Sequence, residues 1–219
     1  MCGLFWHGGS LGRGTLHLHI LLWIKGNPSP QALRDRMQMD ETFHARVIRW
    51  LEQTIQCELP GQTEVLPESD LVRAMVNKGE LDPQLLDMPQ VDALSEHEFQ
   101  TEFSRAVTDL VNTCNWHEHT ETCWKHLRTG DIQDDAHCRM QIDGSTRAST
   151  EIDPESLSVL LHHLHPQINN YNDILMFLLQ CNMDIKYIGS GPAVKALIFY
   201  IMDYITKSSL SVFMPGWMP

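Results

Sequence analysis

Alternating hydrophobic positions near the start of the chain predict a β-strand. From Leu16 to Ile24 every second residue is aliphatic, which is the period of a well-buried strand. One face would carry Leu16, Leu18, Ile20, Leu22 and Ile24, and the other would carry Thr15, His17, His19, Leu21 and Trp23. His17 and His19 are therefore expected side by side, close enough to share a divalent ion, which imidazole binds well.

A helical period near the other end of the chain predicts a helix over 194–207. Its core stripe would consist of Leu197, Ile198, Ile201 and Ile205. Tyr200 and Tyr204 are four residues apart and so share one face of this helix, and Lys207 can share it too. Such a pair of phenols is either ordinary core packing or a pair of nucleophiles.

Between these ends the pattern predicts mainly helices, and the fold class is α+β. Ser29 and Pro30 predict the start of one helix and Asp40 the start of another. The second would bury Phe43, Val47, Trp50, Leu51 and Ile55, and a helix over 96–112 would bury Phe99, Phe103, Val107 and Leu110. A short helix is expected over 172–180, and strands over 156–162 and 182–188. The acidic, proline-rich segment 58–96 predicts a loop insertion with a short helix near 71–77.

Cysteine and histidine are concentrated between residues 114 and 139. The segment contains Cys114, His117, His119, Cys123, His126, His137 and Cys138. Thiolates and imidazoles at this density suit a closed tetrahedral zinc site. The preferred ligands are His117, His119, Cys123 and Cys138, although the spacing is not that of a standard zinc finger and leaves other sets of four open. The triplet His162, His163 and His165 is expected to lie at the surface or to pair with neighbours.

Composition favours an intracellular protein without a membrane span. The longest apolar run is too short to cross a bilayer, no signal peptide is visible, and six cysteines lack the spacing of a small secreted domain. The net charge is −12, and most of the acid lies between residues 31 and 185. Because no cluster of lysine and arginine marks a groove for DNA, affinity for phosphates should be weak and sensitive to salt.

Three segments together resemble the helicase-like replication-initiator domain of Helitron transposases, a family of HUH endonucleases. They are GRGTLHLH at 12–19, NMDI at 182–185, and the segment from Lys195 to Lys207 with its YIMDYITK end. The resemblance implies an HUH-like antiparallel sheet flanked by helices, with an inserted Cys/His-rich segment over 114–139. It also implies rolling-circle transposition, with single-stranded DNA as partner, a nuclear location and an accompanying superfamily 1 helicase domain, which this chain lacks.

The resemblance also implies roles for residues. Tyr200 and Tyr204 would attack phosphodiesters and keep the 5′ phosphate, and Lys207 would offset charge on the phosphate. His17 and His19 would hold Mg²⁺ or Mn²⁺, which polarises the phosphate.

The chain departs from the family where a third metal ligand is expected. The family has Glu and Gln just before the Gly-Arg-Gly, whereas this chain has Gly9, Ser10 and Leu11 there, and His7 is the nearest substitute. We also expect no room for a strand beside the histidine strand, and interpret 1–219 as a single, N-terminally truncated domain. The alternatives are an inactive copy and a non-catalytic protein that binds single-stranded DNA. A zinc hydrolase using His17 and His19 lacks a carboxylate at a recognisable spacing.

Overall fold

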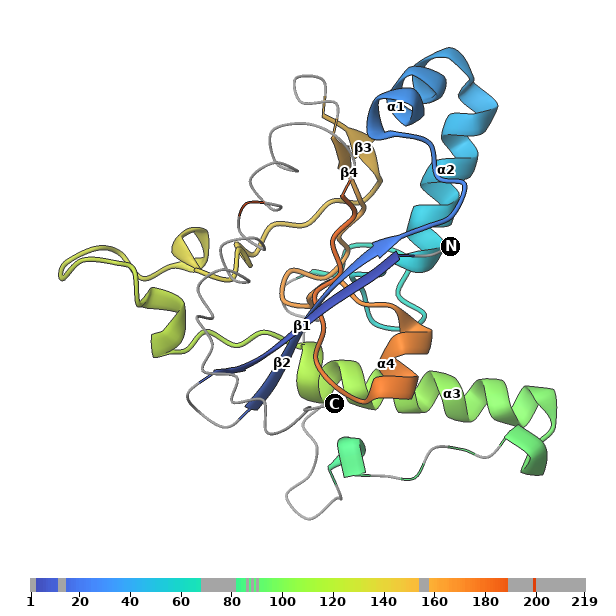
Figure 1. The fold of residues 1–219 in the computed structure, drawn as a ribbon. Helices are drawn as coiled ribbons and strands as arrows, with labels where there is room; N and C mark the ends of the chain where they lie inside the picture. Colours follow the sequence, from blue (N-terminus) through green and yellow to red (C-terminus); the bar gives the residue numbers. More distant parts are fainter. Residues whose placement is uncertain are drawn as a thin grey trace, which may run out of the picture. The chain divides into compact units, whose positions relative to one another are not determined.

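The structure is a computed structural model, and it describes residues 3–11, 15–67, 82–85, 87, 89, 91–153, 158–188 and 199 (Figure 1). The chain divides into two compact units. Unit 1 comprises Met1–His44, Asp153–Ser158 and Ile188–Pro219, and unit 2 comprises Ala45–Ile152 and Val159–Tyr187. The prediction of a single domain over 1–219 stays a prediction, and each unit is described by itself. No helix in the described ranges is both long and apolar enough to cross a membrane.

Unit 1 contains a two-stranded antiparallel ribbon of β1 (Gly3–Leu11) and β2 (Thr15–Trp23). The register runs from Gly3 opposite Trp23 to Leu11 opposite Thr15. The predicted histidine strand is therefore confirmed. The expectation that no strand fits before it is wrong, because β1 pairs with β2 along its whole length.

The aliphatic face of β2 is more exposed than its alternating pattern predicts. Ile20 is 46% exposed and Leu22 is 66% exposed. Alternation reports that a strand has two different faces, but burial needs a second layer over one of them. In the described part of unit 1, β1 is the neighbour to which β2 is hydrogen-bonded.

The first two helices begin where their caps predict. Ser29 Oγ accepts the Ala32 N–H at the start of α1 (Pro30–Met39). Asp40 ends α1, and its carboxylate accepts the Phe43 N–H at 2.9 Å to open α2 (Glu41–Thr54). Unit 2 begins at Ala45, within α2.

The apolar stripe of α2 is confirmed at Leu51 and Ile55 and wrong at Trp50. Leu51 and Ile55 are 1% and 6% exposed, whereas Trp50 is 45% exposed. Residues four apart stack along one face of a helix, but adjacent residues are turned by about 100° from each other. The indole of Trp50 therefore lies outside the face that Leu51 buries.

The core of unit 2 lies between α3 (Glu96–Leu110) and α4 (Asp173–Leu179), which run beside each other in Figure 1. A capping box of Ser95 and Glu98 starts α3, and a π-helical turn over Val111–Asn115 extends it. The buried core consists of Val107, Leu110, Val111, Ile168, Tyr171, Met176 and Phe177, with Phe99 and Phe103 packed against it. The predicted inward face of α3 is thus confirmed, as is the short helix within 172–180.

The remaining predicted elements have mixed outcomes. A second small sheet pairs β3 (Glu151–Ile152) with β4 (Val159–Leu160), and β4 lies within the predicted strand 156–162. The strand predicted over 182–188 is wrong. This segment is instead held by single hydrogen bonds, from Met183 N–H to the Asn115 side chain and from Ile185 N–H to the Asn170 carbonyl. In the acidic segment 58–96 the described residues form loops and two 3₁₀ turns, Pro83–Leu85 and Val91–Ala93.

Two predicted helices cannot be compared with the structure. The short helix near 71–77 lies outside the described residues, as does all of the helix predicted over 194–207 except Phe199. Helices combined with small antiparallel sheets nevertheless agree with the α+β class.

Candidate metal centre

Local turns at the end of α3 bring four potential metal ligands together in unit 2. After the π-helical turn, a bridge between Trp116 and Ile168 and a 2.7 Å hydrogen bond from His117 N–H to the Gln167 carbonyl anchor the chain. His117 and His119 follow in a segment that is neither helix nor strand. Cys123 then lies in a 3₁₀ turn over Glu121–Trp124, and Cys138 follows another over Asp135–His137.

One backbone hydrogen bond ties the two cysteine segments to each other. Arg139 N–H donates to the Cys123 carbonyl at 3.1 Å, which holds residues sixteen apart in sequence side by side. Within each segment, Cys123 N–H donates to the Thr120 carbonyl and Cys138 N–H to the Asp135 carbonyl. The thiols are thus positioned by backbone rather than by the packing of a large core.

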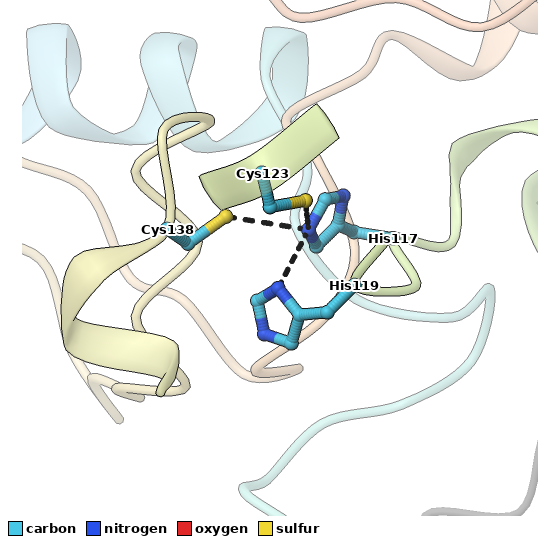
Figure 2. A group of neighbouring side chains, drawn as sticks. All are labelled: His117, His119, Cys123 and Cys138. Atoms are coloured by element: carbon cyan, nitrogen blue, oxygen red, sulfur yellow. Dashed lines mark hydrogen bonds between the residues drawn. The ribbon is translucent and has the colours of Figure 1, made fainter. Parts of the chain in front are cut away.

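Three of the six distances between the ligand atoms match those of a tetrahedral metal site. Nε2 of His117 lies 3.2 Å from Nδ1 of His119, 3.6 Å from Sγ of Cys123 and 3.4 Å from Sγ of Cys138 (Figure 2). A tetrahedron with metal–nitrogen bonds of about 2.0–2.1 Å and metal–sulfur bonds of about 2.3 Å has edges of about 3.3 Å between nitrogens and about 3.6 Å between nitrogen and sulfur. All four ligand atoms lie within 4.8 Å of one another. This group can therefore hold a metal ion.

His119 is oriented by a carboxylate on the side away from the cluster. Its Nε2 lies 3.0 Å from Oδ1 of Asp135, while its Nδ1 faces His117. A carboxylate behind a metal-binding imidazole fixes the ring orientation and raises its basicity. The ring of Trp124 also packs on His119, with 5.0 Å between the centroids.

Burial changes the pKa values of His117 and Cys138 in opposite directions. Burial lowers the pKa of His117, the nearby His119 lowers it further, and Asp135 opposes this. His117 is therefore a neutral ring with a free lone pair near neutral pH. Burial raises the pKa of Cys138, and the neighbouring Cys123 adds to this rise.

The thiol of Cys123 ionises before that of Cys138. Burial alone would raise the pKa of Cys123, but hydrogen bonds from the Thr120 N–H and from His119 outweigh it, so that the pKa is lowered. The two sulfur atoms lie within 4.8 Å of each other, so two thiolates there would repel each other. A bound metal ion would remove this repulsion, because a coordinating thiol is deprotonated outright.

The cluster is shielded but has little apolar packing of its own. Cys123 is 2% exposed and Cys138 and Ile142 are each 7% exposed, with Trp124 packed against them. Four protein ligands without an open position are typical of structural rather than catalytic metal sites. We infer from this geometry that a metal would hold the segment 117–142 together.

The other Cys and His residues of the segment 114–139 lie outside this cluster. Cys114 Sγ donates to the Leu110 carbonyl at 2.9 Å and contacts Met176. His137 pairs with Asp134, and His126 is exposed. The cluster identified among the described residues consists of the four ligands that the sequence favours.

The residues predicted to be catalytic are described only in part. His17 and His19 lie on β2, opposite Gly9 and His7 of β1. Tyr200, Tyr204 and Lys207 lie outside the described residues, so the roles that the resemblance gives them stay predictions.

The triplet at 162–165 is not a surface feature. His162 lies between two carboxylates, with Nε2 3.2 Å from Glu58 and Nδ1 3.5 Å from Glu52. The backbone of His163 pairs with Arg147, and His165 is 1% exposed. Burial lowers the pKa of His165 to about 4, helped by His163, so this ring is neutral. The expected pairing is confirmed, and the expected surface position of His165 is wrong.

Sequence reasoning missed one contributor to these sites, Asp135, and left the register of another, His7, open. Asp135 carries no recognisable spacing, since its contact with His119 depends on the turn that precedes Cys138. The place of His7 opposite His19 depends on a register that the alternation of one strand cannot determine. Searches of protein-family models, of curated proteins and of solved structures found no match to this chain.

Proposed function

We propose that this chain is a metal-dependent endonuclease that nicks single-stranded DNA and stays attached to it through a tyrosine. The proposal rests on the resemblance to Helitron replication-initiator domains and on one structural observation, the register of β1 and β2. Its alternative is a protein that binds single-stranded DNA without cutting it.

The register supports His7 as a substitute for the third ligand of the family motif, which this chain lacks. His7 lies directly opposite His19. Residues directly opposite each other in an antiparallel pair belong to the same face of the sheet, and so do residues two apart on one strand. The positions of His7, His17 and His19 therefore share one face, and Gly9, opposite His17, adds no side chain there. Three imidazoles are a sufficient ligand set for a divalent ion with open positions for phosphate oxygens.

The chemistry follows from the residues that the resemblance assigns. The phenolic oxygen of Tyr200 or Tyr204 forms a bond to phosphorus while the bond from phosphorus to the 3′ oxygen breaks. The phenol gives up its proton, the 3′ oxygen takes one up and leaves as a hydroxyl, and the 5′ phosphate remains on the tyrosine. A divalent ion on the histidines supplies Lewis-acid polarisation of the phosphate. Two tyrosines allow a second strand transfer before the first end is released.

The test is the formation of a covalent adduct. Incubating the chain with a labelled single-stranded oligonucleotide and Mn²⁺ or Mg²⁺ should give a band that survives denaturation, and the double variant Tyr200→Phe/Tyr204→Phe should give none. His7→Ala should reduce the adduct as His19→Ala does, because each removes an imidazole from the same face. His97→Ala, an exposed histidine on α3, is the matched control and should leave adduct formation unchanged.

Three results would count against this mechanism. An adduct in the double phenylalanine variant would refute the tyrosine nucleophiles. Full activity of His7→Ala would refute the third ligand. Oligonucleotide binding without an adduct at any metal concentration would favour the non-catalytic alternative.

We further propose that the cluster of His117, His119, Cys123 and Cys138 binds zinc. Two thiolates and two imidazoles in a closed tetrahedral set match the preference of Zn²⁺ and are poor ligands for Mg²⁺ or Ca²⁺. The separations between the ligand atoms support this assignment.

Zinc content can be measured on protein purified without added metal. One zinc per chain should survive in His17→Ala/His19→Ala and be lost in Cys138→Ser, while His137→Gln should retain it because His137 pairs with Asp134 instead. Asp135→Asn should weaken zinc binding about 10- to 100-fold in a competition with a chelator, because it removes the carboxylate behind His119. Retention of full zinc affinity in Cys138→Ser would assign the metal to other residues.

A further inference from the structure

The outer face of α2 presents two arginines and a tryptophan to solvent. Arg46, Arg49 and Trp50 are spaced i, i+3 and i+4, so they lie on one side of the helix within about one turn (α2, Figure 1). All three are exposed, and all belong to unit 2. This surface is called the α2 face below.

The exposure of Trp50 has no explanation in the packing of unit 2. The apolar side of α2 is already buried through Leu51 and the following Ile55. A tryptophan that is 45% exposed leaves a large flat apolar surface in water, and the mean surface of a protein is depleted in such side chains. An exposed aromatic side chain beside cationic groups is typical of binding surfaces.

The charge of the α2 face is opposite to that of the chain as a whole. The net charge is −12, yet no ion pair among the described residues involves Arg46 or Arg49. By contrast, the exposed Arg105 on α3 is neutralised by Glu102 and Asp109, at 2.6 Å and 3.4 Å.

Glu52, the acidic residue nearest in sequence to Arg49, contacts other residues. Glu52 is the one acidic residue between Ala45 and Thr54. Its carboxylate accepts a 2.6 Å hydrogen bond from Thr150 Oγ1 and lies 3.5 Å from His162. Within the described ranges, no acidic side chain therefore forms an ion pair with the two guanidinium groups beside the exposed indole.

We propose that the α2 face of Arg46, Arg49 and Trp50 binds single-stranded nucleic acid, with a base stacked on the indole and phosphates held by the guanidinium groups. Stacking on an aromatic side chain next to cationic groups that meet the backbone is the recurrent mode of single-strand recognition. Duplex bases are already stacked and cannot lie on the indole, so the face prefers single strands. An acidic peptide would need the arginines but not the tryptophan. Binding here needs neither the tyrosines nor a divalent ion, and so goes beyond the proposed nicking activity.

The experiment measures binding of the full chain to a fluorescein-labelled oligothymidylate by anisotropy, without added Mg²⁺ or Mn²⁺. Trp50→Ala should weaken binding about tenfold or more, and Trp50→Phe, which keeps an aromatic ring, should weaken it less. The double variant Arg46→Gln/Arg49→Gln should weaken binding and reduce the slope of log affinity against log salt by about 1.4, since each phosphate contact on a single strand contributes about 0.7.

Matched controls separate the α2 face from general surface charge. Arg105→Gln removes an exposed but already neutralised arginine and should leave both affinity and salt slope unchanged. Cross-linking of the wild-type chain to an oligonucleotide carrying 5-iodouracil gives a readout without mutation, and the cross-link should map to Trp50.

Several outcomes would overturn the proposal. They are no binding by the wild type, unchanged affinity in both Trp50→Ala and the double arginine variant, equal affinity for duplex DNA, or a cross-link that maps elsewhere. Displacement of the oligonucleotide by polyglutamate, with loss of polyglutamate binding in the arginine variant but not in Trp50→Ala, would assign the face to an acidic protein. These binding results do not depend on formation of the covalent adduct, so they test the α2 face even if no adduct forms.

Discussion

At the scale of single residues, the two nitrogens of a histidine have different tasks in this chain. His119 directs Nδ1 to the Cys/His cluster, and its Nε2 is held by Asp135. In His162 both nitrogens face carboxylates, Glu58 and Glu52, which reach it from different parts of unit 2. Histidine is therefore a potential metal ligand at position 119 and a partner of two carboxylates at position 162.

The contacts of His162 with Glu52 and Glu58 predict a dependence of stability on pH. The hydrogen bond to Glu58 raises the pKa of His162, burial opposes this, and Glu52 adds to the rise. Because the folded pKa lies above the unfolded value of about 6.5, the stabilisation is fully present below about pH 6.5 and is lost as the pH rises through the folded pKa. His162→Gln should therefore lower the free energy of unfolding more at about pH 5.5 than at about pH 8.5.

This difference can be measured by urea unfolding of both proteins at the two pH values. His97→Gln, at an exposed position on α3, controls for the general titration of histidines. An equal loss of stability at both pH values would show that the protonated form of His162 is not the one stabilised by its carboxylates.

At the scale of elements, the short helices depend on their caps. The helix α4 has seven residues, too few to be stable in isolation, so its ends and its packing determine whether it forms. Asn172 connects it to α2. Its side-chain oxygen accepts the Leu175 N–H, and its side-chain nitrogen donates to the Thr54 carbonyl, each at 2.9 Å.

Two substitutions at Asn172 separate its two contacts. Asn172→Ala should lower the free energy of unfolding by about 2 kcal/mol, because it removes a helix cap and leaves the Thr54 carbonyl without its donor. Asn172→Ser keeps an oxygen that can cap the helix and loses the amide donor to Thr54, so it should cost about half as much. Urea unfolding measures both, and an equal loss in the two variants would show that the cap contributes nothing.

At the scale of the whole molecule, the apolar core differs in packing from the Cys/His cluster. The core of α3 and α4 buries several large side chains, whereas the cluster at 117–142 has Ile142 and Trp124 as its apolar packing. A segment with so little packing would depend on a bound metal to stay folded.

Zinc should therefore stabilise the protein in proportion to the logarithm of its free concentration. Above the dissociation constant, each tenfold increase in free zinc should add about 1.4 kcal/mol to the free energy of unfolding. Thermal unfolding in zinc buffers measures this, and Cys138→Ser should show no such dependence. A melting temperature of the wild type that is independent of free zinc would mean that the cluster does not bind the ion in the folded state.

Much of the local structure could be predicted from the sequence, whereas the outcome at several single residues could not. The caps at Ser29 and Asp40 and the inward face of α3 depend on neighbours in sequence, so their patterns were sufficient. Trp50 fitted a helical period but lies outside the buried face. Its position is decided by how α2 packs, which no pattern along α2 reports.

The sequence by itself determined the α+β class, the helix starts, the histidine strand and the Cys/His segment, because each follows from spacing over a few residues or from composition. Only the tertiary structure decided which of the seven Cys and His residues converge. His137 and Cys138 are adjacent in sequence, yet His137 contacts Asp134 whereas Cys138 contacts His117 in the cluster. The tertiary structure also decided the pairing of His7 with His19. Spacing along a chain defines faces and turns, but contacts between distant segments arise from packing and hydrogen bonds that form only when the chain has folded.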